Sequence, residues 1–164
     1  MKLLLLLLLP TTLFCQKIKV NAIDKFTNEK IIETDSKYLR MGFSCGMSAA
    51  YRSVDSFLLI RIDGYGCGVG VVGKDEKFIF LLSDKSTVTV KSKGVQDYKI
   101  GSGSISQNSY SHEYYITKED IKKLSETTIE NTRAYYSNAY EDIEIKKTDG
   151  LIELSKIFLQ AITK

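Results

Sequence analysis

Polar and apolar side chains alternate in short runs through the first two thirds of the chain, and this pattern constrains the fold more than any other feature. Residues 17–22 alternate strictly, and residues 87–91 do the same. A period of two is typical of a strand with one buried face and one solvated face. We therefore expect a largely antiparallel sheet, because such a sheet commonly leaves one face in water.

The remaining segments of this region give a series of further expectations. Residues 78–82 form an unbroken apolar run, which predicts a central strand covered on both faces. The other expected elements are a hairpin over 17–35, a long bent strand over 38–52, a strand over 57–62, a polar loop over 101–111 and a return to the sheet at 114–116.

Two helices are expected in the last third of the chain. Thr117 can accept a hydrogen bond from the Asp120 amide in an arrangement like a capping box, which predicts a helix over 118–126. A helical apolar stripe predicts a second helix over 149–162, capped by Thr148 or Asp149. Two strands, 129–136 and 140–146, are expected between them. The order of elements predicts a single α+β domain over 16–164.

The first 15 residues have the features of a secretory signal peptide. Lys2 is followed by seven leucines, then Pro10 and a more polar exit that ends at Cys15. The apolar run is too short to span a bilayer, so we expect no transmembrane segment after its removal. Cleavage after Cys15 would leave a periplasmic or secreted protein. In the alternative, Cys15 carries a lipid as the first residue of a lipoprotein, although Phe14 is bulky for that processing.

The charge balance gives no electrostatic reason to expect nucleic acid as a partner. The chain has 23 basic and 20 acidic residues. Loss of Lys2 with the leader leaves a net charge of +2, and the charges are interspersed. A nucleic-acid-binding protein usually concentrates basic residues on one face.

Two cysteines remain after cleavage, Cys45 and Cys67. A disulfide between them is possible in an oxidising compartment, and two buried free thiols are the alternative. If residues 38–52 and 56–66 form a hairpin about Ser53–Asp55, Cys45 lies opposite residue 62 or 63. This offset argues against the bond.

Residues 68–73 match the pattern G-x-G-x-x-G of dinucleotide-binding loops. That motif needs a helix N-terminus directly after the glycines, where backbone amides meet a pyrophosphate. Here the glycines lead into the expected strand 78–82. We therefore expect a bent or bulged strand and no nucleotide or other cofactor.

His112 is the only histidine, so any catalytic dyad or triad of the His type must use it. We expect a surface histidine beside a serine-rich loop. The alternative is a small hydrolase in which His112 activates a cysteine or a serine. The acidic pairs Glu119–Asp120 and Glu141–Asp142 are expected to be solvated. No metal site is expected, because the chain lacks closely spaced ligand pairs.

Tyrosines are numerous, with ten in the chain and no tryptophan. An exposed face rich in tyrosine would suit a carbohydrate or protein partner. Adjacent tyrosines on a strand point to opposite faces, so about half of them are expected in the core. Six of them fall in one third of the chain: Tyr110, Tyr114, Tyr115, Tyr135, Tyr136 and Tyr140.

The segment Ile23-Asp24-Lys25-Phe26-Thr27-Asn28-Glu29-Lys30 resembles the opening of a group of uncharacterised small exported proteins common in Bacteroidetes. In that group a D-x-F-T-G-like turn precedes a strand, and Asn28 stands here in place of the usual glycine. The similarity extends through 57–62, 78–90, 116–120 and 133–146. It implies an exported α+β domain and no catalytic residue.

Together these features favour a non-enzymatic binding module that acts outside the cytoplasm on a protein or a glycan. The hydrolase built on His112 is the alternative, and a structural envelope component that oligomerises is a third hypothesis.

Overall fold

A computed structural model describes residues 18–67, 72–94, 98–99, 108–136 and 139–163. The leader 1–15 lies outside the described residues, as does most of the glycine motif. The elements are β1 (Ile18–Ile23), β2 (Lys30–Thr34), β3 (Lys37–Arg40), β4 (Gly46–Val54), β5 (Phe57–Tyr65), β6 (Lys77–Leu82), β7 (Thr87–Ser92), β8 (Tyr98–Lys99), β9 (Ser109–Tyr115), α1 (Lys118–Glu126), β10 (Ile129–Tyr136), β11 (Ala139–Glu144) and α2 (Asp149–Thr163).

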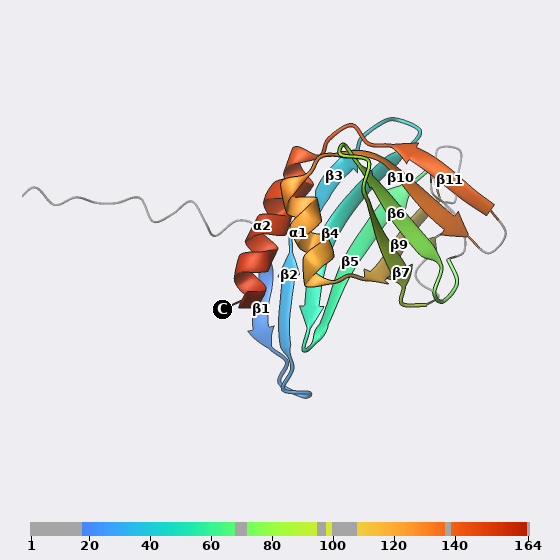
Figure 1. The fold of residues 1–164 in the computed structure, drawn as a ribbon. Helices are drawn as coiled ribbons and strands as arrows, with labels where there is room; N and C mark the ends of the chain where they lie inside the picture. The colour runs from blue at the N-terminus through green and yellow to red at the C-terminus, as the bar shows by residue number, and fades with distance from the viewer. Residues whose placement is uncertain (1–17, 68–71, 95–97, 100–107, 137–138, 164) are drawn as a thin grey trace, which may run out of the picture.

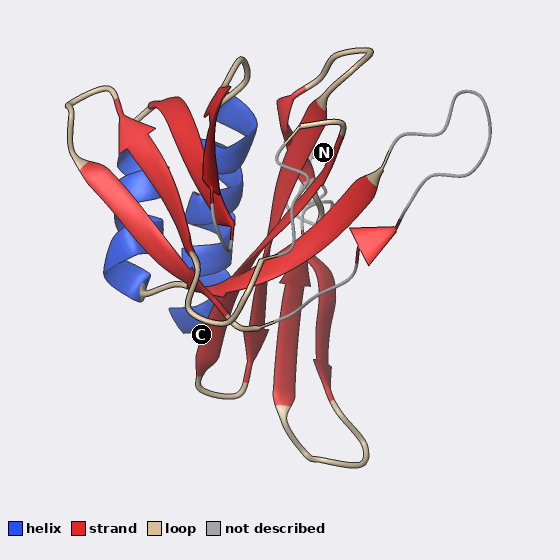
Figure 2. Ribbon diagram, turned by 90° about the vertical axis from the view of Figure 1, so that its right-hand side faces the viewer, coloured by secondary structure: helices blue, strands red, loops and turns tan. Residues whose placement is uncertain are grey.

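The strands form one antiparallel sheet, and the two helices lie side by side against it (Figure 1). The order along the sheet is β1-β2-β4-β5-β9-β7-β6-β10-β11; β3 pairs with β4, and β8 pairs with β9. The sheet is strongly curved, so that β6, β7, β10 and β11 fold away from the plane of β4 and β5 (Figure 2). The expected α+β class is confirmed.

One apolar cluster joins the inner face of the sheet to both helices. The ring of Tyr51 on β4 stacks on Phe158 of α2, with 5.1 Å between centroids. On the other side of the core, Phe78 contacts Phe80 and Tyr114 at 5.0 and 5.5 Å. Burial of these large rings is part of the hydrophobic driving force for folding.

Local signals place both helices where the sequence predicts them. The Thr117 side chain accepts a hydrogen bond from the Asp120 amide at 3.1 Å, and the helix begins at the next residue. Ile116 and Ile121 are both buried on the two sides of this cap, as in a hydrophobic staple. For α2, the Thr148 carbonyl accepts hydrogen bonds from the amides of Leu151 and Ile152.

Three expected elements, two strands and one loop, differ from the structure. The single bent strand over 38–52 is wrong, because the chain turns at residues 41–45 and β3 pairs back on β4. The loop over 101–111 is wrong at its end, since Ser109–Ser111 belong to β9. The expected strand over 140–146 ends at Glu144, where β11 ends.

The prediction that residues 78–82 are covered on both faces is also wrong. Phe78, Phe80 and Leu82 point into the core and are buried, whereas Ile79 and Leu81 are half-exposed on the opposite face. In the described part of the chain no helix covers that face, because α1 and α2 both lie on the inner side of the sheet.

Cys45 and Cys67 form a disulfide, with 5.1 Å between their Cα atoms. The expected register, which set Cys45 opposite residue 62 or 63, is wrong. The turn after β4 lies later than expected, at Asp55–Ser56, where Asp55 adopts a left-handed φ of 51° and Val54 pairs directly with Phe57. This register pairs Gly46 with Tyr65 and so brings Cys45 beside Cys67.

Removal of the disulfide is expected to destabilise the fold. The bond closes a loop with a sequence separation of 22 residues. In the chain-entropy model a loop of this length is worth about 3 kcal/mol. We expect the double variant Cys45→Ala/Cys67→Ala to lose that amount in urea unfolding. The wild type treated with a reductant should lose the same amount, and unchanged midpoints in both samples would refute the prediction.

Gly66, next to the disulfide, is expected to tolerate no side chain. Its φ is +75°, and an added Cβ would overlap the Ser44 carbonyl. We expect Gly66→Ala to cost about 2 kcal/mol or more in urea unfolding, from left-handed strain and overlap together. Gly73→Ala is the matched control, because an added Cβ there meets only Glu76, at 3.6 Å. Equal effects of the two substitutions would contradict this account.

Candidate functional site

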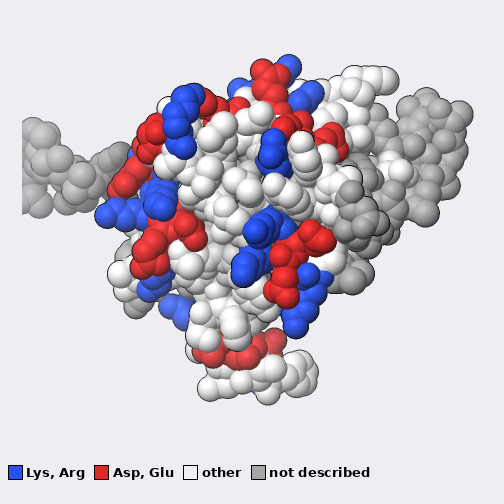
Figure 3. All heavy atoms as spheres, turned by 45° about the vertical axis from the view of Figure 1, so that its right-hand side comes forward, with Lys and Arg blue, Asp and Glu red and all other residues white. Residues whose placement is uncertain are grey.

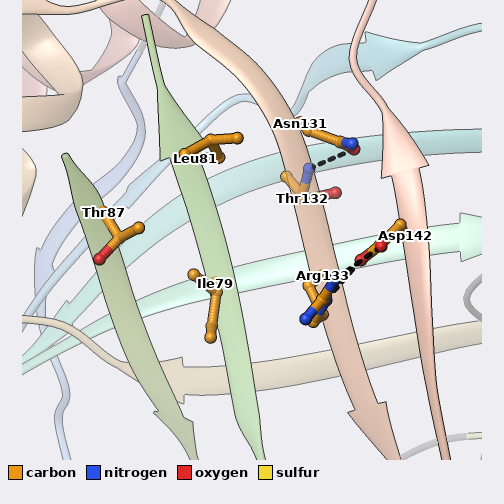
Figure 4. A pocket seen from close by; sticks show the side chains of 7 residues that line it. All are labelled: Ile79, Leu81, Thr87, Asn131, Thr132, Arg133 and Asp142. Atoms are coloured by element: carbon orange, nitrogen blue, oxygen red, sulfur yellow. Dashed lines mark hydrogen bonds and ion pairs between the residues drawn. The ribbon is translucent and has the colours of Figure 1, made fainter. Parts of the chain in front are cut away.

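A shallow depression of about 270 Å³ lies on the outer face of β7, β6, β10 and β11 (Figure 4). We call it the outer depression. It is lined by Ile79, Leu81, Thr87, Asn131, Thr132, Arg133 and Asp142. These residues come from four neighbouring strands, so the sheet itself holds them in place.

The strand registers explain why these side chains meet. Leu81 pairs with Thr87 on one side and with Asn131 on the other. Two residues away along β6 and β10, Ile79 pairs with Arg133, and Arg133 pairs in turn with Asp142 on β11. Residues paired across strands share one face, so two parallel rows of side chains form the site.

Arg133 and Asp142 form a two-bond ion pair at one side of the outer depression. Arg133 Nε donates to Asp142 Oδ1 at 2.5 Å, and Arg133 Nη2 donates to Oδ2 at 2.7 Å. The guanidinium also lies over the Tyr140 ring, 4.3 Å from its centroid. Two hydrogen bonds and a ring contact fix the orientation of Arg133.

This ion pair changes the acidity of both groups. The hydrogen bonds from Arg133 lower the pKa of Asp142 below its ordinary value, and the same bonds raise the pKa of Arg133. Both groups are therefore ionised over the whole physiological range. Their charges cancel, so the two side chains together carry no net charge.

Asn131 on β10 belongs to the row that contains Leu81 and Thr87, next to the row that contains Arg133. Its side-chain oxygen accepts a hydrogen bond from the Thr132 amide at 2.8 Å. This bond identifies which end of the side-chain amide is oxygen, so the NH₂ group is the end that remains for a ligand. The pairing of β10 with β6 shifts between Ile129 and Asn131, which is typical of a β-bulge.

Ion pairs occupy the outer face of the other half of the sheet. Glu33 on β2 binds Lys19 at 3.3 Å and Arg61 at 3.2 Å, and Arg61 also binds Asp63 at 3.1 Å. Burial opposes ionisation of Glu33, but the Lys19 hydrogen bond and the Arg61 charge outweigh it and lower its pKa. Figure 3 shows basic and acidic groups in contact across one face of the molecule.

The interpretation of His112 as a surface residue is wrong. His112 is only 2 % exposed, and its ring stacks on Tyr110 at 5.0 Å and meets the edge of Tyr114 at 6.5 Å. The cause is the register of β9, which pairs His112 with Ile62 on the inner face of the sheet.

The two cysteines and the adjacent Ser111 are each engaged elsewhere than with His112. Cys45 and Cys67 are joined to each other, so neither offers a thiolate in this structure. Ser111 is adjacent to His112 but points to the opposite face, where its hydroxyl donates to Asp63 Oδ1 at 2.6 Å. The described residues hold no group of three or more His, Cys, Asp or Glu side chains suited to a metal ion.

The tyrosines divide between core and surface as the strand pattern predicts. Tyr114 is buried and its neighbour Tyr115 is 43 % exposed. Tyr110 is buried as well, with its ring lying across Gly64 on the neighbouring strand. Tyr140 is 57 % exposed and lies beside the outer depression, with its ring 5.9 Å from that of Tyr135.

Residues 68–71 of the glycine motif lie outside the described residues. The chain that follows Gly73 turns and enters strand β6, so no helix begins after the glycines. As expected, a strand and not a helix follows the glycines.

Comparisons with family models, with curated proteins and with solved structures found no match to this chain. Neither helix in the described part of the chain combines the length and the apolar composition that a bilayer crossing needs.

Sequence reasoning missed the outer depression, although one signal for it was present. The predicted hairpin about Ser137–Asn138 sets Arg133 opposite Asp142, and opposite charges in that position form a cross-strand pair. The apolar floor was missed because the run 78–82 was expected to be buried on both sides.

The Arg133–Asp142 pair is expected to persist in mild acid. Because the folded pKa of Asp142 is lowered, the pair is complete above the ordinary aspartate range and is lost only as the pH falls through the lowered pKa. A carboxyl titration followed by NMR should show this. Arg133→Met should return the Asp142 pKa towards its ordinary value, and an unchanged midpoint in that variant would contradict the assignment.

Proposed function

We propose that this chain is an exported, non-enzymatic binding module of the cell envelope or secreted fraction, and that it holds its ligand in the outer depression. The leader 1–15 supports export, and processing after Cys15 supports release from the membrane. Removal of the leader would leave the domain 16–164 as the part of the protein that carries the function.

One observation carries this proposal: a concave site with a half-exposed apolar floor, bordered by fixed polar groups, on a face that neither described helix covers. Ile79 and Leu81 supply the floor, and Asn131 and the Arg133–Asp142 pair supply the polar border. Binding sites are concave, largely apolar and equipped with a few well-placed polar groups. Rigid strands hold such groups more precisely than loops do.

The support for binding rather than catalysis is the chemistry of the lining. Asp142 is engaged by Arg133 and has a lowered pKa, which makes it a poor general base. Thr87 is the one exposed hydroxyl among the lining residues, and no histidine or cysteine lines the site. These groups can hold a ligand by hydrogen bonds and apolar contact.

The proposal predicts that a charge on the floor abolishes binding. The purified exported protein is immobilised and exposed to envelope extract, and it should retain a component of that extract. The variant Ile79→Asp should retain about tenfold less of this component, because binding would then have to desolvate a carboxylate. Phe57→Asp is the matched control, since Phe57 is an exposed apolar residue on β5, in the other half of the sheet.

Circular dichroism and thermal unfolding must show that both variants fold. Leu81→Ser is a milder second variant if Ile79→Asp unfolds. Equal retention by the wild type and by a folded floor variant would refute the proposed site.

A further inference from the structure

We infer that the outer depression binds one ring of a neutral glycan, with a neighbouring sugar resting on Tyr140. This inference rests on the proposed function and names the ligand class of the same site. It follows from the charge, the hydrogen-bonding groups and the shape of the lining.

The charge of the site favours a neutral ligand. Arg133 and Asp142 are the two charged residues in the lining, and they are bonded to each other by two hydrogen bonds. An anionic or cationic ligand would have to compete with a pair that is already satisfied. A neutral ligand can use the remaining hydrogen-bonding capacity without breaking the pair.

The polar groups of the site include both donors and acceptors. The NH₂ group of Asn131 can donate, because its oxygen is bonded to Thr132. Each carboxylate oxygen of Asp142 accepts one bond from Arg133 and has a second lone pair. The Thr87 hydroxyl can do both. A sugar hydroxyl also donates and accepts, and adjacent hydroxyls fit this spacing of fixed partners.

The floor matches the apolar side of a sugar ring. Ile79 and Leu81 lie side by side on β6, half-exposed at the bottom of the outer depression (Figure 4). The C–H groups on one side of a sugar ring can pack on such a surface while the hydroxyls at its edge reach the polar border. An aliphatic peptide side chain would use the floor but would leave Asn131 and Asp142 without ligand hydrogen bonds.

Tyr140 extends the site towards the edge of the sheet. Its ring is 57 % exposed, and Arg133 covers one side of it. An exposed aromatic ring offers a flat apolar surface with a polar tip. Its position beside the outer depression suits a second sugar of the same chain.

The affinity should be weak, as expected for a single small ring. At the usual binding free energy per ligand atom, one sugar ring reaches a dissociation constant on the order of a few millimolar. We expect cellotetraose, mannotetraose or xylotetraose to shift the amide NMR signals of Ile79, Leu81 and Asn131 in this range. Monosaccharides should shift the same signals more weakly.

Two variants separate the parts of the site. Asn131→Ala should weaken both monosaccharide and tetrasaccharide binding about three- to tenfold, since it removes a donor common to both. Tyr140→Ala should weaken tetrasaccharide binding alone. Tyr115→Ala, which removes an exposed tyrosine from β9, is the control and should change neither. An equal loss with Tyr115→Ala, or no shift with any of the three tetrasaccharides, would overturn the inference.

The capture experiment distinguishes this inference from the proposed function. Periodate oxidises vicinal diols and cleaves the C–C bond between the two carbons that carry the hydroxyls, and protease removes protein. Retention by the wild type that survives protease and is lost after periodate supports a glycan. Retention that survives periodate and is lost after protease overturns the glycan inference but leaves the binding module intact. Equal retention by the wild type and Ile79→Asp refutes both.

Discussion

The packing of Phe78 against Phe80 and Tyr114 is the interaction on which the rest of the structure depends. These rings fix which face of β6 and β9 is turned to the core. A shift of one residue in a strand would move every side chain to the opposite face. The same contacts that bury Phe78 and Phe80 therefore place Ile79 and Leu81 on the outer face and create the apolar floor of the outer depression.

Much of the fold was predictable because its signals are local. The cap at Thr117 and the apolar stripe of 149–162 predict both helices, and tight polar turns predict the β1–β2 and β10–β11 hairpins. Long-range pairing was not predictable. Nothing local indicates that β9 lies between β5 and β7, and this pairing is what buries His112. The error at Cys45 was smaller, since the turn lies at Asp55–Ser56, later than expected, and this moves the register.

The candidate site shows the same division between local and long-range information. The Arg133–Asp142 pair belongs to one hairpin and could be read from its turn. The contact of this pair with Ile79 depends on the pairing of β10 with β6. These two strands are separated in the sequence by a helix and by more than 40 residues. A set of residues that is scattered in this way forms a site only through the sheet, which explains why no short motif marks it.

The two edges of the sheet differ in a way that bears on solution behaviour at high concentration. The outermost described strand, β11, carries Glu141 and Glu144 besides the paired Asp142, so two copies approaching along this border would bring like charges together. The opposite border, β1, has a single lysine and an exposed Ile23. Self-association by strand addition is therefore discouraged next to the outer depression, and any tendency to aggregate is concentrated at the β1 border.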